Sequence, residues 1–270
     1  MIRIQGIFIV LLFSMTAWSQ KGSWIEKQIY PMQADGVWSV DGLENVYIAQ
    51  FGLINKFDST GKLKFSQSIK SLGSMTQLVP INTMKLIHFS EEQQTLCYLD
   101  NTLSPLDDCI DLTEEGIVNA VMVSESNQPN KIWVLDNLNS RLLLLPLDNV
   151  YQTQELVNLR GVLDLNQVTQ FVERNNQVVL LDATKGVYIF DLYGSLLDYF
   201  PEKNVLAVDA NEQMLFLLRA DGLYIRSFAS GETLRVDVPV TGVIDFAYRN
   251  HFFFFRTEKA VHKFALQFSE

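Results

Sequence analysis

Residues 187–197 read Val-Tyr-Ile-Phe-Asp-Leu-Tyr-Gly-Ser-Leu-Leu, an apolar stretch that ends at an aspartate and resumes after a glycine. Residues 54–66 repeat this pattern as Ile-Asn-Lys-Phe-Asp-Ser-Thr-Gly-Lys-Leu-Lys-Phe-Ser. Asp, Ser, Thr and Gly favour tight turns, whereas aromatic and β-branched residues favour strands. Each stretch is therefore predicted to be a β-hairpin.

A strongly apolar strand of four residues recurs six times along the chain. The six strands are 46–49, 86–89, 132–135, 178–181, 214–217 and 252–255, and their starts lie 40, 46, 46, 36 and 38 residues apart. Another short strand is expected before each of them, and a third and usually a fourth after it. Sustained helical periodicity is nearly absent beyond the N-terminal segment. Repeats of about forty residues with four short strands each are typical of a β-propeller.

The two ends of the repeat array predict how the ring closes. The sixth unit offers strands at 243–248, 252–255 and 260–264 but no fourth strand, whereas residues 24–30 form a strand with no unit of their own. We expect this N-terminal strand to become the outer strand of the last blade, which pins the first and last blades together. The predicted fold is an all-β, six-bladed β-propeller. A seven-bladed ring, with one blade hidden in the longer second and third units, is the alternative.

The hairpins at 56–63 (Lys-Phe-Asp-Ser-Thr-Gly-Lys-Leu) and 189–196 (Ile-Phe-Asp-Leu-Tyr-Gly-Ser-Leu) resemble the repeats of six-bladed TolB-like and NHL-type propellers. As a repeat shape, the resemblance covers essentially all of the chain beyond the N-terminal segment. It implies a ring of blades around a channel and a role in binding. It carries over no catalytic residue, because a fold alone does not fix a function.

The N-terminal segment has the pattern of a secretory signal peptide. One arginine precedes the unbroken apolar run 6–13, and residues 17–19, Ala-Trp-Ser, have the small residues that signal peptidase reads. We expect residues 1–19 to be removed before Gln20, and residues 20–270 to form a single propeller domain in the periplasm or envelope. A membrane anchor or a buried strand is the alternative, although an apolar core of about ten residues is too short to cross about 30 Å of hydrocarbon.

The two cysteines, Cys97 and Cys109, flank a turn-rich stretch, Asn-Thr-Leu-Ser-Pro at 101–105. If Asp100 pairs with Leu106 across this hairpin, the same register places Cys97 opposite Cys109, close enough for a disulfide. Such a bridge suits an oxidising compartment, and closing a loop of about thirteen residues stabilises a fold by about 3 kcal/mol. Two buried free thiols are the alternative. A zinc site is not expected, because two isolated thiols do not make a zinc shell.

Charge and motif content narrow the function. The chain has 21 Lys and Arg against 31 Asp and Glu, a formal net charge of −10. We expect no nucleic-acid partner, because phosphate binding needs a basic surface. We also expect no later membrane span, no cofactor, no metal and no catalytic residue, since no nucleophile elbow, zinc-protease motif or phosphate loop is present. The three histidines fall in different units (His88, His251 and His262), which favours ordinary core or surface roles.

The inner strands of a propeller face its central channel, where propeller enzymes usually build their sites. The polar channel-lining candidates are Ser39, Gln77, Asn119, Gln170 and Asp245, and the fifth unit offers Ala207. These residues either bind water, a cation or a small polar ligand, or are polar only because they face a water-filled channel. We favour the second interpretation, because calcium sites commonly use several carboxylates and only one is present here.

Three functional hypotheses follow. The favoured one is a non-catalytic, exported propeller that binds a protein partner through the loops of one face and acts as a scaffold in cell-envelope assembly. The second is a divalent-ion-dependent lactonase or hydrolase with Asn119, Gln170 and Asp245 as ligands at the channel. The third is a carbohydrate-binding propeller, for which Trp38 is the best aromatic candidate, although packing is the favoured role of that side chain.

Overall fold

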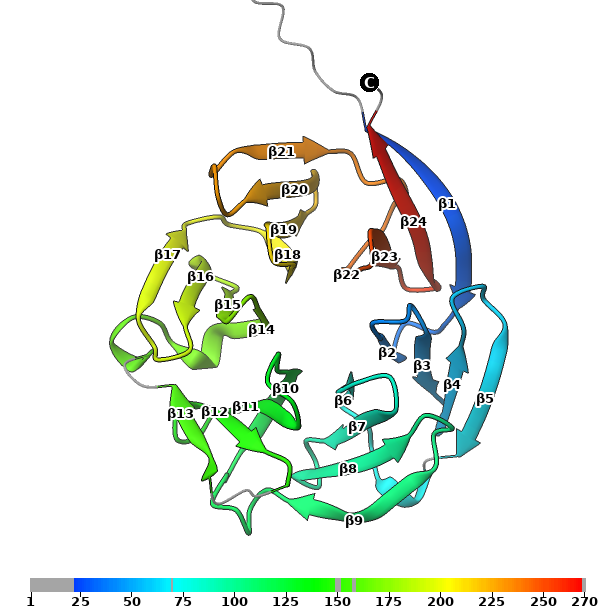
Figure 1. Cartoon of the computed structure of the whole chain (residues 1–270), viewed down its shortest axis with the longest axis vertical. Helices are drawn as coiled ribbons and strands as arrows, with labels where there is room; N and C mark the ends of the chain where they lie inside the picture. The colour runs from blue at the N-terminus through cyan, green and yellow to red at the C-terminus, as the bar shows by residue number, and fades with distance from the viewer. Residues whose placement is uncertain (1–21, 69, 149–151, 157–158, 269–270) are drawn as a thin grey trace, which may run out of the picture.

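Six four-stranded antiparallel sheets surround a central channel like the blades of a propeller (Figure 1). The computed structural model describes residues 22–68, 70–148, 152–156 and 159–268. It confirms the all-β, six-bladed prediction and excludes a seventh blade among these residues. The expected signal peptide, residues 1–19, lies outside the described residues.

The first five blades each use four consecutive strands, which run outward from the channel in chain order. Blade 1 contains β2 (Val37–Val40), β3 (Val46–Gln50), β4 (Leu53–Phe57) and β5 (Leu63–Ser68). Blade 2 contains β6 (Gln77–Pro80), β7 (Lys85–Ser90), β8 (Thr95–Asp100) and β9 (Pro105–Asp111). Blade 3 contains β10 (Ala120–Glu125), β11 (Lys131–Asp136), β12 (Arg141–Pro146) and β13 (Gln154–Leu156). Blade 4 contains β14 (Val168–Arg174), β15 (Gln177–Asp182), β16 (Gly186–Asp191) and β17 (Leu196–Phe200). Blade 5 contains β18 (Val205–Ala210), β19 (Met214–Arg219), β20 (Gly222–Ser227) and β21 (Thr233–Val236). Within the described residues, helical structure is confined to short 3-10 turns between blades, including η1 (Lys70–Leu72), η3 (Leu159–Gly161) and η4 (Leu165–Gln167).

The last blade joins the two ends of the chain. It contains β22 (Asp245–Arg249), β23 (Phe252–Arg256) and β24 (Ala260–Phe268), and its outer strand is β1 (Gly22–Pro31). Figure 1 shows β1 beside β24, although the two strands come from opposite ends of the sequence. The predicted closure of the ring is therefore confirmed.

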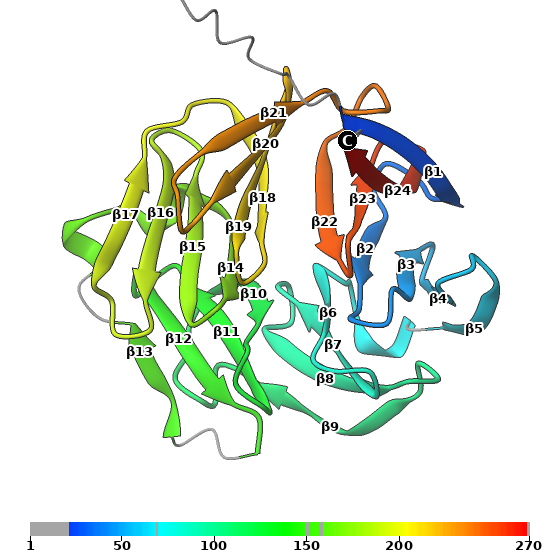
Figure 2. The same cartoon turned by 45° about the horizontal axis from the view of Figure 1, so that its top comes forward.

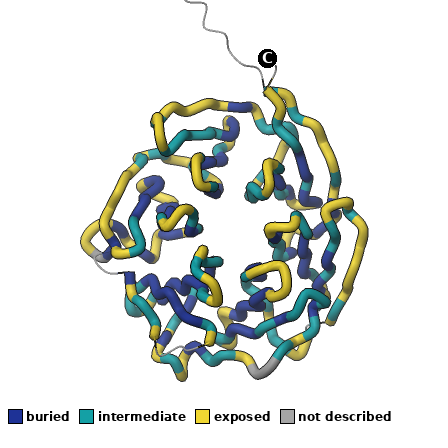
Figure 3. The backbone as a smooth tube through the Cα atoms, in the orientation of Figure 1, coloured by how far each residue is buried: buried dark blue, intermediate teal, exposed yellow. Residues whose placement is uncertain are grey.

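The core lies between neighbouring blades rather than within one layer. The second and third strands of the blades carry most of the fully buried side chains, because each sheet packs on a neighbour on both faces. Figure 3 shows the buried colour concentrated in the middle of the blades. In the last blade Phe253, Phe254 and Phe255 are all buried, and Trp24 of β1 contacts Phe253 edge-on at 5.2 Å between ring centroids. The dense aromatic run 252–255 is thus explained by packing.

The hairpins that suggested the fold are β4–β5 and β16–β17, and an aspartate organises each turn. Asp58 Oδ1 accepts hydrogen bonds from the backbone N–H groups of Thr60 and Lys62. Asp191 Oδ1 likewise accepts from the backbone N–H groups of Tyr193 and Ser195. The Thr60 hydroxyl, which also donates to Asp58 Oδ1, lowers the pKa of Asp58 together with these backbone groups, and the backbone donors lower the pKa of Asp191. The aspartates that end these strands are therefore turn formers.

The cysteines form a disulfide, as predicted, but by a different register. Cys97 and Cys109 are bonded, with their Cα atoms 4.3 Å apart. Near the turn, Leu106 pairs with Tyr98 rather than with Asp100, so the register that we expected there is wrong. A bulge between Leu96 and Tyr98 then shifts the pairing and brings the two cysteines together.

A buried aspartate at the end of β11 gives a pH-dependent prediction. Asp136 is 0% exposed, and its Oδ2 accepts hydrogen bonds from Arg141 Nη2 at 2.6 Å and Asn139 Nδ2 at 2.8 Å. Burial alone raises the pKa of Asp136, but the bonds from Asn139 and Arg141 outweigh it and lower the pKa. The carboxylate therefore stabilises the fold above the unfolded-state pKa of about 3.9, and this contribution is lost as the pH falls through the lower folded-state pKa.

We expect Asp136→Asn to destabilise the protein at pH 7 by about 2–3 kcal/mol, because the replacement leaves Arg141 without its buried counter-charge. Urea unfolding at pH 7 and at pH 3 measures the free energy of unfolding of both proteins. The difference between variant and wild type should be smaller at pH 3. Glu258→Gln, a change at an exposed acid, is the control. A difference in free energy of unfolding that is the same at both pH values would contradict the prediction.

Candidate functional site

The inner strands of all six blades enclose a central cavity of about 410 Å³. Four of the predicted channel residues line it, namely Ser39, Gln77, Gln170 and Asp245. Asn119 and Ala207 are not among the lining residues. Asn119 precedes β10, and its backbone carbonyl accepts a hydrogen bond from the backbone N–H of Asn137 at 2.9 Å.

Three of these channel side chains connect one blade to the next. Gln77 Oε1 of blade 2 accepts a hydrogen bond from the backbone N–H of Val123 in blade 3 at 2.7 Å. Gln170 Oε1 of blade 4 accepts one from the backbone N–H of Val208 in blade 5 at 2.8 Å. Their acceptor groups thus hold two blade junctions together.

Asp245 has the same role at the junction between the last blade and blade 1. Its Oδ2 accepts a hydrogen bond from Trp38 Nε1 at 2.9 Å, and its Oδ1 accepts one from the backbone N–H of Phe246. Burial raises the pKa of Asp245, although these two donors oppose the rise. Trp38 is only partly buried, and its indole is fixed at the junction by this bond.

The three residues that we expected as divalent-ion ligands do not come together. Gln170 and Asp245 line the cavity, but Asn119 does not. Among the described residues, no group of three or more His, Cys, Asp or Glu side chains is placed to hold a metal ion.

The histidines lie apart from the cavity. His88 is fully buried, with neither ring nitrogen hydrogen-bonded within the described chain, and burial lowers its pKa. His262 Nδ1 lies 3.1 Å from Glu26 Oε1, and His251 Nδ1 lies 3.5 Å from the Tyr248 hydroxyl.

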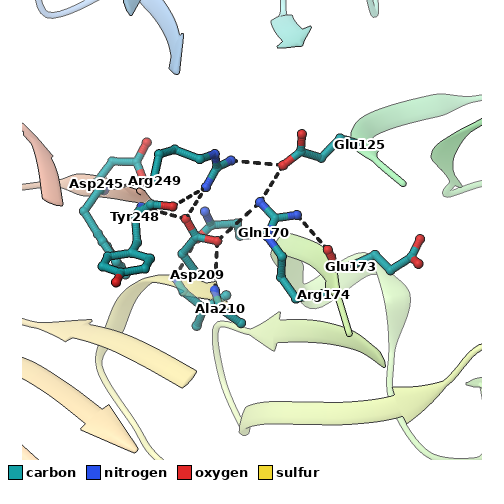
Figure 4. A network of polar contacts seen from close by, with 11 residues as sticks. Glu125, Gln170, Glu173, Arg174, Asp209, Ala210, Asp245, Tyr248 and Arg249 are labelled. Atoms are coloured by element: carbon teal, nitrogen blue, oxygen red, sulfur yellow. Dashed lines mark hydrogen bonds and ion pairs between the residues drawn. The ribbon is translucent and has the colours of Figure 1, made fainter. Parts of the chain in front are cut away.

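Sequence reasoning missed a ring of four charged side chains in the channel, near the C-terminal ends of the inner strands (Figure 4). We call these residues, Glu125, Arg174, Asp209 and Arg249, the charge quartet. Arg249 binds Asp209 Oδ2 at 2.7 Å and Glu125 Oε1 at 3.0 Å. Arg174 binds the same Glu125 oxygen at 2.5 Å and lies 3.7 Å from Asp209 Oδ1. The quartet therefore joins blades 3, 4 and 5 and the last blade, which we also call blade 6, near the ends of their inner strands.

The two arginines and two carboxylates of the quartet have no net charge, and most of their side chains are poorly solvated. The side chains of Asp209, Arg174 and Arg249 are only 4%, 14% and 20% exposed. Burial alone lowers the pKa of Arg249, but the charges of Asp209 and Glu125 outweigh it and raise that pKa. Opposite charges attract one another more strongly in a low-dielectric site than in water. The guanidinium groups of Arg174 and Arg249 are thus paired with carboxylates inside the protein.

Beyond the quartet lies a second cavity, of about 510 Å³, on the face where the inner strands end. We call this surface the end face, and the opposite surface, where the inner strands begin, the start face. The turns that leave β10, β14, β18 and β22 supply five asparagines to this end-face pocket: Asn127, Asn175, Asn176, Asn211 and Asn250. The backbone φ angles of Asn175, Asn176 and Asn250 are 52°, 56° and 49°. Asparagine tolerates this left-handed conformation better than most residues do, which explains its presence in these turns.

The loops of the start face carry more exposed apolar side chains than the loops of the end face. Large apolar side chains that are at least about a third exposed occur at five loop positions of the start face, Phe51, Val118, Leu138, Val162 and Ile244, and at two strand starts, Leu53 and Leu206. Among the described residues of the end face, they occur in loops at Leu43, Met84 and Tyr193 and at strand ends at Leu63, Leu196, Leu234 and Phe268. Figure 2 shows the strands of the blades running between the two faces. The remaining exposed apolar residues lie along outer strands or close to the ends of blades.

Phe51 stands out on the start face. It is 74% exposed at the tip of the β3–β4 turn, and its φ angle is 54°. A left-handed conformation costs a bulky residue about 1–2 kcal/mol, so this position would suit asparagine or glycine better for stability alone. An exposed aromatic ring held in a strained conformation is a candidate contact residue.

Comparisons with known proteins support the fold and no finer assignment. No protein-family model matches the chain, and no curated protein is similar to it in sequence. The WD40 domain of Neurospora crassa Pan2 superposes with a TM-score of 0.61 at 10% identity, over 92% of this chain and 98% of that one. An inactive variant of virginiamycin B lyase from Staphylococcus aureus, solved with quinupristin, gives a TM-score of 0.57 at 9% identity, over 92% and 100%. BBS1N, solved in complex with ARL6, gives 0.56 at 13% identity, over 85% and 77%.

These likenesses establish a β-propeller, a fold that serves both binding and catalysis. The finer resemblance to TolB-like and NHL-type repeats stays a prediction. Among the described residues, no helix has the length and apolar character needed to span a bilayer.

Proposed function

We propose that this chain is an exported, non-catalytic propeller that binds another protein through its start face and acts as a scaffold in the cell envelope. The observation that carries the proposal is Phe51, an aromatic ring that is 74% exposed on a strained turn. Aromatic side chains contribute most of the binding energy at many protein interfaces. Scattered apolar residues are ordinary on a surface, so the exposed ring of Phe51 on its strained turn carries more weight than any single leucine.

Other features support this proposal. Val118 and Leu138 sit on segments of blade 3 that are hydrogen-bonded to one another, between Asn119 and Asn137, so that the two apolar residues belong to one site. Leu206 and Ile244 lie at the mouth of the central cavity, on neighbouring blades. The net charge of −10 favours a partner with a basic rim around an apolar centre. A rigid ring that presents loops on one face is well suited to recognition, and BBS1N is one propeller with a protein partner.

The disulfide between Cys97 and Cys109 is compatible with export, because disulfides persist in oxidising compartments. The exported form is expected to begin at Gln20. Mass spectrometry of protein isolated from the native envelope measures its N-terminus, and retention of residues 1–19 would contradict export by a cleaved signal peptide.

The variant Phe51→Asn tests whether the Phe51 side chain serves partner binding or the stability of the fold, because the two roles predict opposite effects on stability. We expect this variant to be more stable than wild type by about 1 kcal/mol, because asparagine relieves the left-handed strain, and to bind the partner at least tenfold more weakly. The measurements are urea unfolding and affinity capture of the tagged protein from crosslinked envelope. Tyr193→Ser is the matched control, because Tyr193 is 77% exposed but lies on the end face.

A protein captured in stoichiometric amount by wild type and Tyr193→Ser, but lost with Phe51→Asn, would support the proposal. Capture of the same protein by Phe51→Asn at wild-type level would contradict docking on the start face. The absence of any stoichiometric partner for a folded, abundant wild-type protein would contradict the scaffold role itself.

A further inference from the structure

The end-face pocket has polar groups that the fold does not use. The side-chain amides of Asn127 and Asn176 line its cavity of about 510 Å³ and make no hydrogen bond within the described chain. Each amide offers two donors and one acceptor oxygen. These two residues come from the turns of neighbouring blades 3 and 4, so they can act on one ligand from two sides.

Of two further asparagines in the pocket, one is fully engaged and one is half engaged. Asn211 accepts hydrogen bonds with its Oδ1 from the backbone N–H groups of Gln213 and Met214, and its side chain also hydrogen-bonds to the Tyr248 hydroxyl. Asn250 donates from its Nδ2 to the Gly42 carbonyl at 2.6 Å, which leaves its Oδ1 as an acceptor. The pocket thus presents unused donors and acceptors from three turns, those of Asn127, Asn176 and Asn250.

The charge of the pocket does not favour an ionic ligand. Arg174 and Arg249 form part of its lining, but Glu125 and Asp209 already neutralise both of them. Glu212 is the remaining charged residue of the lining. A phosphate or carboxylate would have to displace a buried counter-ion and approach a chain of net charge −10. The ligand chemistry that fits is neutral and rich in hydroxyl or amide groups.

The lining also lacks a pocket for an apolar anchor. Its apolar contributors are Ala210 and Tyr248, and the Tyr248 ring already packs on Phe216 at 4.4 Å and on Phe253 at 4.8 Å between centroids. A peptide ligand usually depends on an apolar or aromatic side chain that fills such a pocket. The vicinal hydroxyl groups of a saccharide, by contrast, both donate to and accept from side-chain amides directly.

We infer that the end-face pocket is a binding site for a neutral saccharide of about one or two sugar units, with Asn127 and Asn176 as its principal hydrogen-bonding residues. The cavity volume suits a ligand of this size, since small-molecule sites span about 300–1,000 Å³. The site lies on the opposite face from the proposed protein contact and does not depend on it.

The test uses the whole chain and a panel of probes: cellobiose, maltose, lactose, chitobiose, glucuronic acid and triglycine. Saturation-transfer NMR detects binding and isothermal titration calorimetry measures it. We expect at least one neutral disaccharide to bind with a Kd below about 1 mM, and neither glucuronic acid nor triglycine to bind. The variant Asn127→Ala/Asn176→Gly should weaken binding at least tenfold. Glycine at position 176 keeps the left-handed backbone, whose φ is 56°.

Asn204→Gly is the matched control, because Asn204 is also left-handed, with a φ of 61°, but precedes β18 on the start face. It should bind the disaccharide as wild type does. Failure of every disaccharide to bind would overturn the inference, as would binding that the double variant leaves unchanged. Binding of triglycine without any disaccharide would assign the pocket to peptides and overturn it too.

Discussion

A chain that begins at Met32, and so lacks β1, is expected to lose its cooperative unfolding transition. β1 pairs with β24 at nine positions, from Gly22 opposite Phe268 to Pro31 opposite Ala260. Trp24 packs against three phenylalanines of the last blade and donates from its Nε1 to the Asp237 carbonyl at 2.7 Å. Truncation of a buried aromatic residue costs about 3–5 kcal/mol, and the partly buried Trp24 contributes a share of this.

The closing strand also fastens the last blade to the first. Tyr30 is 1% exposed and lies in one hydrophobic cluster with Val46 and Ile48 of blade 1 and Phe254 of the last blade. The loss of the partly buried Trp24, the buried Tyr30 and a whole strand ladder removes much of the about 5–15 kcal/mol that stabilises a typical domain. Without β1, the outer edge of β24 is open and the ring can separate at this junction.

Urea unfolding followed by far-UV circular dichroism, together with hydrogen exchange, measures the effect of the deletion. A synthetic peptide of residues 20–31, added in excess, should restore protection of β24 by pairing with its free edge. Ile25→Ser/Ile29→Ser is the control, since both side chains are exposed on β1, and it should unfold like wild type. An unchanged midpoint and slope for the shortened chain would show that the ring does not depend on this strand.

The architecture was predictable because it depends on local patterns that repeat. Turn-forming aspartate and glycine residues flanked by apolar strands mark the β4–β5 and β16–β17 hairpins directly. The unpaired strand at one end and the missing strand at the other implied the closure. Register was less predictable, because bulges such as the one between Leu96 and Tyr98 arise from three-dimensional packing and leave no clear mark in the sequence.

The site was predictable only in part. Gln77, Gln170 and Asp245 were placed at the channel from their strand positions, but their bonds to the next blade depend on how blades pack. The charge quartet was missed because its members lie far apart in the chain: Arg174 is 49 positions after Glu125, and Arg249 is 40 positions after Asp209. One signal was present, the repetition of an Arg-Asn pair at 174–175 and 249–250, in which each arginine is the last residue of an inner strand.

The charge quartet leads to the second large prediction. We expect Asp209→Asn to destabilise the protein by about 3–5 kcal/mol, because it leaves two poorly solvated arginines with a single carboxylate. Asparagine has nearly the same shape, and its carbonyl oxygen can still accept the hydrogen bond from the Tyr248 backbone N–H, which Asp209 Oδ2 accepts at 2.8 Å. Because Asp209 Oδ1 also accepts from the backbone N–H of Ala210, the variant loses one acceptor oxygen as well as the charge, and the loss reports these two changes rather than packing.

A double-mutant cycle distinguishes this explanation from simple damage to the inner strand. Asp209→Asn/Arg249→Gln removes one charge of each sign, so the double variant should be more stable than the sum of the single effects predicts, by at least about 1 kcal/mol. Asp237→Asn is the matched control, because Asp237 pairs with Arg235 at 2.9 Å but is 86% exposed, and such surface pairs contribute about 0–1 kcal/mol. Urea unfolding of all four variants gives the coupling energy. If Asp209→Asn cost no more than Asp237→Asn, or if the single effects were simply additive, the quartet would be incidental, and neighbour-to-neighbour packing alone would hold blades 3 to 6 in place.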